Sequence, residues 1–161
     1  RPRAAPSANA RAGDADDDDD EGFGDEPFTV DAPIGRDLAS RIRMAVRHDG
    51  KPSKTDFKLL AQRTVAGLDV VALQCKLHTG RTHQIRVHAA WSGHPLLADA
   101  LYGGPSSLGL TRQALHAWRL QLVHPVSGKV LAIQAPLPDD LKAAWKTAGG
   151  PAIRRLTPML A

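Results

Sequence analysis

Short runs in which apolar and polar residues alternate, separated by turn-forming residues, constrain the fold of this chain more than any other feature. The clearest run ends at Leu77, where Val71, Leu73, Cys75 and Leu77 alternate with polar or small residues. Successive side chains of a strand point to opposite faces, so this pattern predicts a strand with one buried face. Cys75 falls on the apolar face, where a packed, unreactive thiol is expected.

Further segments are expected to form strands, and two turn-rich stretches between them predict hairpins. The expected strands are 28–30, 43–46, 55–62, 115–122 and 130–133. The turn at 48–52 is expected to join 43–46 to 55–62 in one hairpin. The turn at 124–129 is expected to join 115–122 to 130–133 in the other. One helix is expected from an N-cap at Thr82 to about Trp91, and a shorter one over 141–147. Strands with segregated helices predict an α+β fold, with a mainly antiparallel, mixed sheet and flanking helices.

Charge divides the chain into two unequal parts. Residues 1–31 hold ten acidic residues and three Arg, whereas residues 32–161 hold 18 Lys and Arg against 7 Asp and Glu. The acidic segment 1–27 has too little apolar surface to offset the entropy of ordering, so we expect it to be disordered. We expect the folded part to span 28–148 and a flexible tail to follow over 149–161.

The composition also bears on partners and on the compartment. A folded part this basic favours nucleic acid as a partner, although a basic surface can serve solubility alone. The acidic run from Asp16 to Glu21 is read as a solvated linker, with competition against RNA as the alternative. No apolar run approaches the roughly 20 residues of a membrane span, and one cysteine excludes an internal disulfide. A cytoplasmic location without membrane contact is therefore expected.

The polar block from Thr79 to His88 is hard to explain by packing alone. It holds two Arg, two His, two Thr and a Gln within ten positions. On the expected helix, Arg86 projects from a rigid support, and its planar guanidinium suits a carboxylate or a phosphate. Arg81 lies beside the helix N-terminus, where free backbone N–H groups favour anions.

This block has other interpretations. On composition alone, an ordinary amphipathic helix with solvated Arg and His is favoured. No metal is expected, because His78, His83 and His88 are spaced five apart, rotate off a common helix face and lack acidic or Cys partners at ligand spacing. A helix-turn-helix DNA reader would need a second helix, which the following segment does not provide.

Residues 77–88, Leu-His-Thr-Gly-Arg-Thr-His-Gln-Ile-Arg-Val-His, resemble the signature of the RluA-type RNA pseudouridine synthases. The similarity is greatest to the bacterial members that act on large-subunit ribosomal RNA. Further blocks agree in the family's order, and these are 30–35, 50–52, 93–96, 99–103, 113–117 and 124–128. The resemblance spans residues 28 to 146.

The resemblance implies the pseudouridine synthase fold and an isomerase that needs no metal or organic cofactor. Such enzymes flip a uridine out of RNA, detach its base from C1′ and rejoin it through C5. A catalytic Asp is implied in an upstream His-Arg-Leu-Asp block, with Arg86 as its partner. This block does not occur in the 161 residues. We therefore expect the C-terminal half of a catalytic domain, inactive alone.

The resemblance and the charge also suggest which residues contact RNA. The candidates are Lys51, Lys54, Arg81, His83 and Gln84. Ribosomal RNA is the expected partner and transfer RNA the alternative, while the target uridine is not specified by these residues. The competing interpretation is a non-catalytic RNA-binding fragment or module that keeps the basic face without the chemistry.

Overall fold

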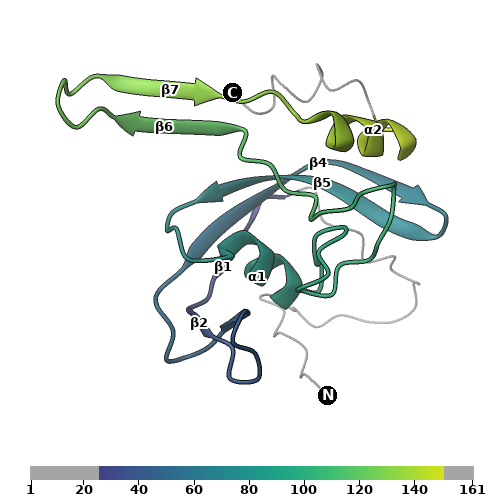
Figure 1. Ribbon diagram of the computed structural model, residues 1–161, viewed down its shortest axis with the longest axis horizontal. Helices are drawn as coiled ribbons and strands as arrows, with labels where there is room; N and C mark the ends of the chain where they lie inside the picture. The colour runs from purple at the N-terminus through teal and green to yellow at the C-terminus, as the bar shows by residue number, and fades with distance from the viewer. Residues whose placement is uncertain (1–25, 151–161) are drawn as a thin grey trace, which may run out of the picture.

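A long antiparallel hairpin organises the computed structural model, which describes residues 26–150 (Figure 1). Strands β4 (Lys54–Val65) and β5 (Leu68–Leu77) pair along almost their whole length. Strand β1 (Phe28–Asp31) adds to the other edge of β4, which gives the order β1-β4-β5. The expected strands at 28–30, 55–62 and 71–77 are confirmed, with β4 and β5 longer than predicted.

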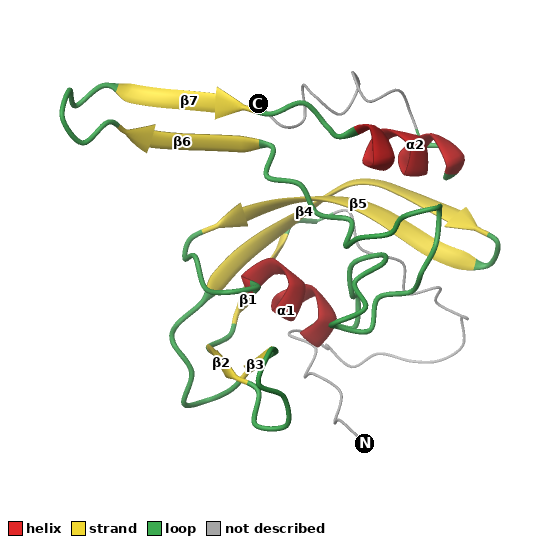
Figure 2. Ribbon diagram, in the orientation of Figure 1, coloured by secondary structure: helices red, strands yellow, loops and turns green. Residues whose placement is uncertain are grey.

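Two smaller antiparallel pairs and two helices complete the fold. They are β2 (Ile34–Arg36) with β3 (Met44–Val46), β6 (Arg119–Val123) with β7 (Val130–Gln134), α1 (Gln84–Trp91) and α2 (Asp139–Thr147). Helix α1 lies on one side of the β4–β5 hairpin, while β6, β7 and α2 lie on the other (Figures 1 and 2). Every strand pair within the described residues is antiparallel, so the predicted α+β class is confirmed.

The predicted hairpin between 43–46 and 55–62 is wrong, because β3 pairs with β2 instead of β4. The turn after β3 folds back across β2, where Ile34 and Lys51 exchange backbone hydrogen bonds of 2.9 and 2.8 Å. Gly50 permits this approach, since a Cβ there would lie 2.6 Å from the carbonyl carbon of Ile34. The turn-forming residues thus predicted that the chain reverses after β3, but they did not predict which strand pairs with β3. The β6–β7 hairpin is confirmed, although β6 begins at Arg119, later than predicted.

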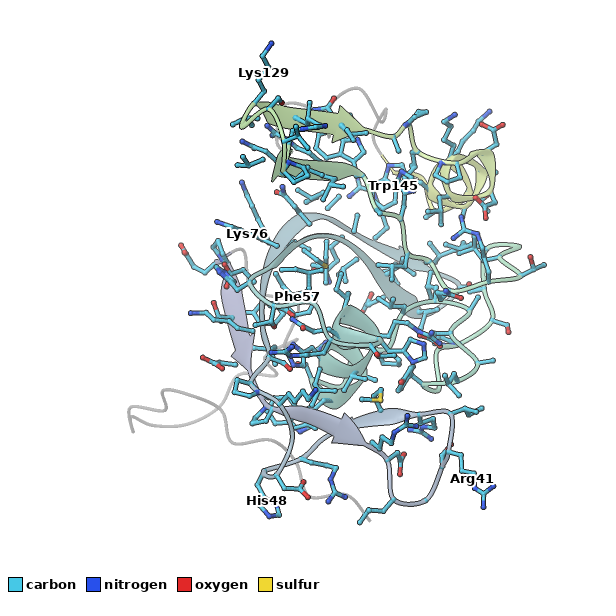
Figure 3. The ribbon with its side chains drawn as sticks, turned by 60° about the vertical axis from the view of Figure 1, so that its left-hand side comes forward. Arg41, His48, Phe57, Lys76, Lys129 and Trp145 are labelled. Carbon is cyan, nitrogen blue, oxygen red and sulfur yellow. The ribbon has the colours of Figure 1, made fainter. Side chains whose placement is uncertain are left out.

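The core lies between α1 and the sheet. Phe57, 1% exposed, packs with Val30 and Ala32, and its ring stacks on Phe28 at a centroid distance of 5.0 Å. Figure 3 shows Phe57 between the sheet and α1. Val87 of α1 belongs to the adjoining apolar cluster. This packing fixes α1 against the sheet and so gives the polar block a rigid support.

Cys75 is packed against this core, and burial raises the pKa of its thiol to about 12. Because the thiolate is the reactive form, we expect native Cys75 to resist iodoacetamide at pH 8 and to be alkylated quickly in urea. Mass spectrometry of timed samples measures both rates. Native alkylation as fast as that of the unfolded chain would contradict the packed position.

Within residues 26–150, no helix has the length and apolar character needed to cross a membrane. The predictions of a disordered segment over 1–27 and a flexible tail over 149–161 concern residues that lie almost entirely outside the described part of the chain.

Candidate functional site

The polar block begins with a loop held by one buried side chain, Gln84. Its Oε1 accepts hydrogen bonds from the Thr79 hydroxyl at 2.8 Å and the Arg81 backbone N–H at 2.9 Å. Its Nε2 donates to the Lys54 carbonyl and to Thr55 Oγ1, both at 3.0 Å. All four hydrogen-bonding positions of the amide are therefore filled. Gln84 therefore holds the loop, and its contact with RNA stays a prediction.

A chain of hydrogen bonds continues from this amide through Thr55 to His88, one turn further along α1. His88 is fully buried, with Nδ1 2.9 Å from Thr55 Oγ1 and Nε2 3.0 Å from the Ala32 carbonyl oxygen. Desolvation lowers the pKa of His88, which favours a neutral ring. Its Nε2–H then donates to Ala32, and Nδ1 accepts from Thr55. His88 therefore ties α1 to β4 and to Ala32, which directly follows β1.

Arg86 makes a two-pronged ion pair with Asp99. Its Nε donates to Oδ2 at 2.8 Å and its Nη2 to Oδ1 at 2.7 Å, with the two side chains only 13% and 1% exposed. Burial by itself would raise the pKa of Asp99, but the hydrogen bonds and charge of Arg86 outweigh it and lower that pKa. Asp99 is therefore held ionised, and it fixes the plane of the guanidinium.

The structure thus pairs Arg86 with a carboxylate of this chain, which the sequence did not predict. The guanidinium also lies over the Tyr102 ring, 4.9 Å from its centroid. Its Nη1 has no hydrogen-bond partner among residues 26–150. The Nε and Nη2 groups of Arg86 therefore bind Asp99, and the Nη1 group can donate to a second acceptor.

The chain enters α1 through His83, whose φ of 57° lies in the left-handed region. No side chain caps the helix, so the predicted N-cap at Thr82 is wrong. The His83 Nδ1 lies 2.9 Å from the Tyr102 hydroxyl oxygen, which accepts the Met44 backbone N–H at 3.0 Å. The two rings meet edge to face at a centroid distance of 5.6 Å. Tyr102 thus joins α1, β3 and Arg86.

An open groove of about 450 Å³ lies beside the start of α1, between the β2–β3 region and the loop before the helix. Arg36, Lys51 and Arg81 line it, and Gly35, Gly50 and Gly80 contribute no side chain to its wall. We call this the basic groove. Arg81 is anchored there by its Nε, which donates to the Pro52 carbonyl at 3.1 Å.

Asp49 is the acidic residue among those that line the basic groove. Arg47 donates to its carboxylate from Nε at 2.8 Å and from Nη2 at 2.6 Å. This hydrogen bonding lowers the pKa of Asp49. The neighbouring Arg therefore balances its charge, which leaves the groove with an excess of positive charge.

Of the residues predicted to contact RNA, the groove brings Lys51 and Arg81 together. Lys54 does not line it, since it begins β4 and its backbone is bound by Thr79 and Gln84. His83 directly follows the groove residue Thr82.

Three contributors were missed from the sequence, and these are Arg36, Asp99 and Tyr102. The last two lie in the 99–103 block, whose match to the family was the signal that could have found them.

Comparison with known proteins agrees with the resemblance seen in the sequence. A family model described as RNA pseudouridylate synthase matches residues 13–91. The chain is 51% identical over 122 residues to the ribosomal large subunit pseudouridine synthase D of Nitrosomonas europaea, covering 71% of this chain and 34% of that protein. It is 47% identical over 119 residues to an uncharacterized RNA pseudouridine synthase of Bacillus subtilis, covering 74% and 38%.

Among solved structures, human RNA pseudouridylate synthase domain containing 1 superposes with a TM-score of 0.64 at 32% identity, covering 76% of this chain and 54% of that one. The chain spans between a third and two fifths of the length of the two bacterial relatives.

Proposed function

Since this chain belongs to the RluA-type family of RNA pseudouridine synthases, we propose that it forms the Arg86-bearing part of a domain that isomerises uridine in RNA. The observation that carries this proposal is the state of Arg86. Its guanidinium is nearly buried, is held in one plane by Asp99 and keeps Nη1 without a partner among the described residues. Such a group is prepared to orient a second anion.

In the proposed reaction, Nη1 of Arg86 binds the catalytic carboxylate, which belongs to a part of the synthase outside these residues. In a site shielded from water, this pairing keeps the carboxylate ionised and aimed at the sugar or base. The C1′–N1 bond of uridine breaks, the base turns, and a C1′–C5 bond forms. C5 loses its proton and N1 gains one. Asp99 acts through Arg86, as its positioning residue.

The basic groove would bind the RNA backbone. Arg36, Lys51 and Arg81 can each contact a phosphate, and such contacts offset the few kcal/mol needed to extrude a base. We extend this to ribosomal RNA as the substrate, with transfer RNA as the alternative, and to action in the cytoplasm.

The β6–β7 hairpin supports the proposal that further polypeptide completes the domain. Leu120 lies opposite Ile133 and Leu122 opposite Leu131, so the four side chains share one face. All four are exposed. An isolated two-stranded hairpin is only marginally stable in water, and an apolar face of this kind needs a covering layer.

A chimera tests the proposed function. In the Nitrosomonas relative, the segment that matches this chain is replaced by this chain, and tritium release is measured from RNA labelled at uridine C5. We expect release by the chimera and none by the 161-residue polypeptide alone. Arg86→Gln in the chimera should lower the rate about 10²-fold or more, because it removes a preorganised charge.

The matched control is Arg112→Gln, which breaks the exposed ion pair with Asp140 and should leave the rate unchanged. Tritium release by the 161-residue polypeptide alone, at the chimera's rate, would refute the proposal that the catalytic carboxylate lies outside these residues. A folded, RNA-binding chimera that releases no tritium would favour the second candidate, a non-catalytic RNA-binding module. That candidate draws support from the partner that Arg86 already has in Asp99.

A further inference from the structure

The contact between His83 and Tyr102 determines where the imidazole proton lies. The Tyr102 oxygen accepts the Met44 backbone N–H at 3.0 Å, since an amide can only donate. The hydroxyl has one proton of its own, and His83 Nδ1, at 2.9 Å, is the remaining polar partner among the described residues. Tyr102 is 7% exposed, so a hydroxyl proton aimed elsewhere would lose its acceptor. Nδ1 therefore accepts, and the proton of a neutral ring sits on Nε2.

The charges around His83 agree with a neutral ring. Desolvation and the positive charge of Arg86 lower the pKa of His83, while Asp99 opposes them more weakly. Arg43 adds a second guanidinium, 5.5 Å from the centroid of the Tyr102 ring that His83 meets edge to face. Two cations thus border the pair, and the buried carboxylate is already engaged by Arg86.

The backbone of His83 is a second, independent observation. Its φ of 57° is a conformation in which a side chain costs about 1–2 kcal/mol relative to glycine. Strain of this kind gathers at functional positions. The Nε2 of this ring has no partner among residues 26–150. Tyr102 also joins the ring to Met44, which lines the basic groove. Thr82, the residue before His83, lines the same groove.

We propose that Tyr102 is a positioning residue that locks His83 as a neutral imidazole, whose Nε2–H donates to an oxygen of RNA at the end of the basic groove. The role in RNA contact rests on the proposed function, whereas the lock does not. Unlike Lys51 and Arg81, this donor carries no charge, so it recognises an acceptor without displacing counterions.

Nuclear magnetic resonance tests the lock without any RNA. Long-range proton–nitrogen correlation on the ¹⁵N-labelled 161-residue chain at neutral pH should show His83 with a protonated Nε2 and an unprotonated Nδ1. In Tyr102→Phe the preference should become incomplete, with the Nδ1-protonated tautomer detectable as it is in a free neutral imidazole. His78, whose Nε2 binds Asp56 at 2.6 Å, should keep its signals in both proteins and so report an intact fold. A protonated Nδ1 in the wild type, or an equally complete Nε2 preference in folded Tyr102→Phe, would overturn the lock.

Binding of oligouridine, measured at several salt concentrations, tests the donor. His83→Asn keeps a residue that tolerates the left-handed backbone, and should weaken binding about three- to tenfold without changing the salt slope. Lys51→Gln, as the comparison, should reduce that slope by about 0.7. Unchanged affinity or a reduced slope in His83→Asn would overturn the donor role. Wild-type protein that binds no RNA would instead refute the proposed RNA contact. The magnetic resonance result would still test whether Tyr102 fixes the tautomer of His83.

Discussion

Replacing Arg86 by Met is expected to destabilise the fold by about 3–5 kcal/mol, because the buried Asp99 carboxylate would lose its counter-charge. Urea unfolding measures the change in the free energy of unfolding. Arg112→Met, which breaks an ion pair with both partners substantially exposed, should lose no more than about 1 kcal/mol. The double variant Arg86→Met with Asp99→Leu should regain much of the loss, since no unpaired charge would remain.

The pH dependence of this loss has a definite sign. The pKa of Asp99 is lowered in the folded protein, so its contribution to stability is present above the ordinary aspartate pKa and is lost as pH falls. In Arg86→Met, the pKa of Asp99 should rise, because the effect of burial would be opposed only by backbone hydrogen bonds such as that from the Tyr102 N–H. The difference between wild type and variant should therefore shrink on acidification from pH 7 toward pH 3. An equal difference at both pH values, or a loss no larger than in Arg112→Met, would contradict the importance of the pair.

The second large effect is expected on RNA affinity. Replacing Arg36, Lys51 and Arg81 together by Gln should reduce the slope of log affinity against log salt by about 2, at roughly 0.7 per phosphate contact on single strands. At low salt, affinity should fall about 10²-fold. Filter binding of oligouridine at several salt concentrations measures both quantities.

A matched triple variant removes the same charge elsewhere. Arg119, Lys129 and Lys146 are exposed residues of the β6–β7 hairpin and α2, which lie across the sheet from α1. Figure 3 places Lys129 at the tip of the hairpin, at the opposite end of the molecule from Arg41 and His48 in the β2–β3 region. Changing these three to Gln should leave the slope nearly unaltered. Equal losses in the two triple variants would mean that RNA responds to net charge and not to the groove.

Local sequence pattern predicted most individual elements. The alternation that ends at Leu77 gave a half-buried strand, and the turn at 124–129 joins β6 to β7 as expected. These features depend on neighbours a few residues apart, whose geometry is set by the backbone itself. The partner of β3 could not be predicted in this way. It depends on the contact of Gly50 with Ile34, two residues from different segments.

In the candidate site, too, some residues could be selected from local sequence, whereas the roles of others depend on tertiary contacts. Arg86, Lys51 and Arg81 stand out as cations in a matched motif or near a turn, so the sequence alone is enough to select them. The structural role of Gln84 was not predicted, because the polarity of an amide does not reveal whether its partners are the protein's own backbone or a ligand. Four internal partners fill it here.

The sequence by itself indicated the family, the α+β class and most of the strands, and it selected Arg86 as a candidate site residue. Only the tertiary structure decided that Asp99 holds Arg86, that Tyr102 joins His83 to Met44, and that Arg36 shares a groove with Lys51 and Arg81. The physical reason is distance along the chain. Motifs and periodicity report what neighbouring residues can do, whereas the proton on a ring or the charge of a buried carboxylate depends on groups that meet only after folding.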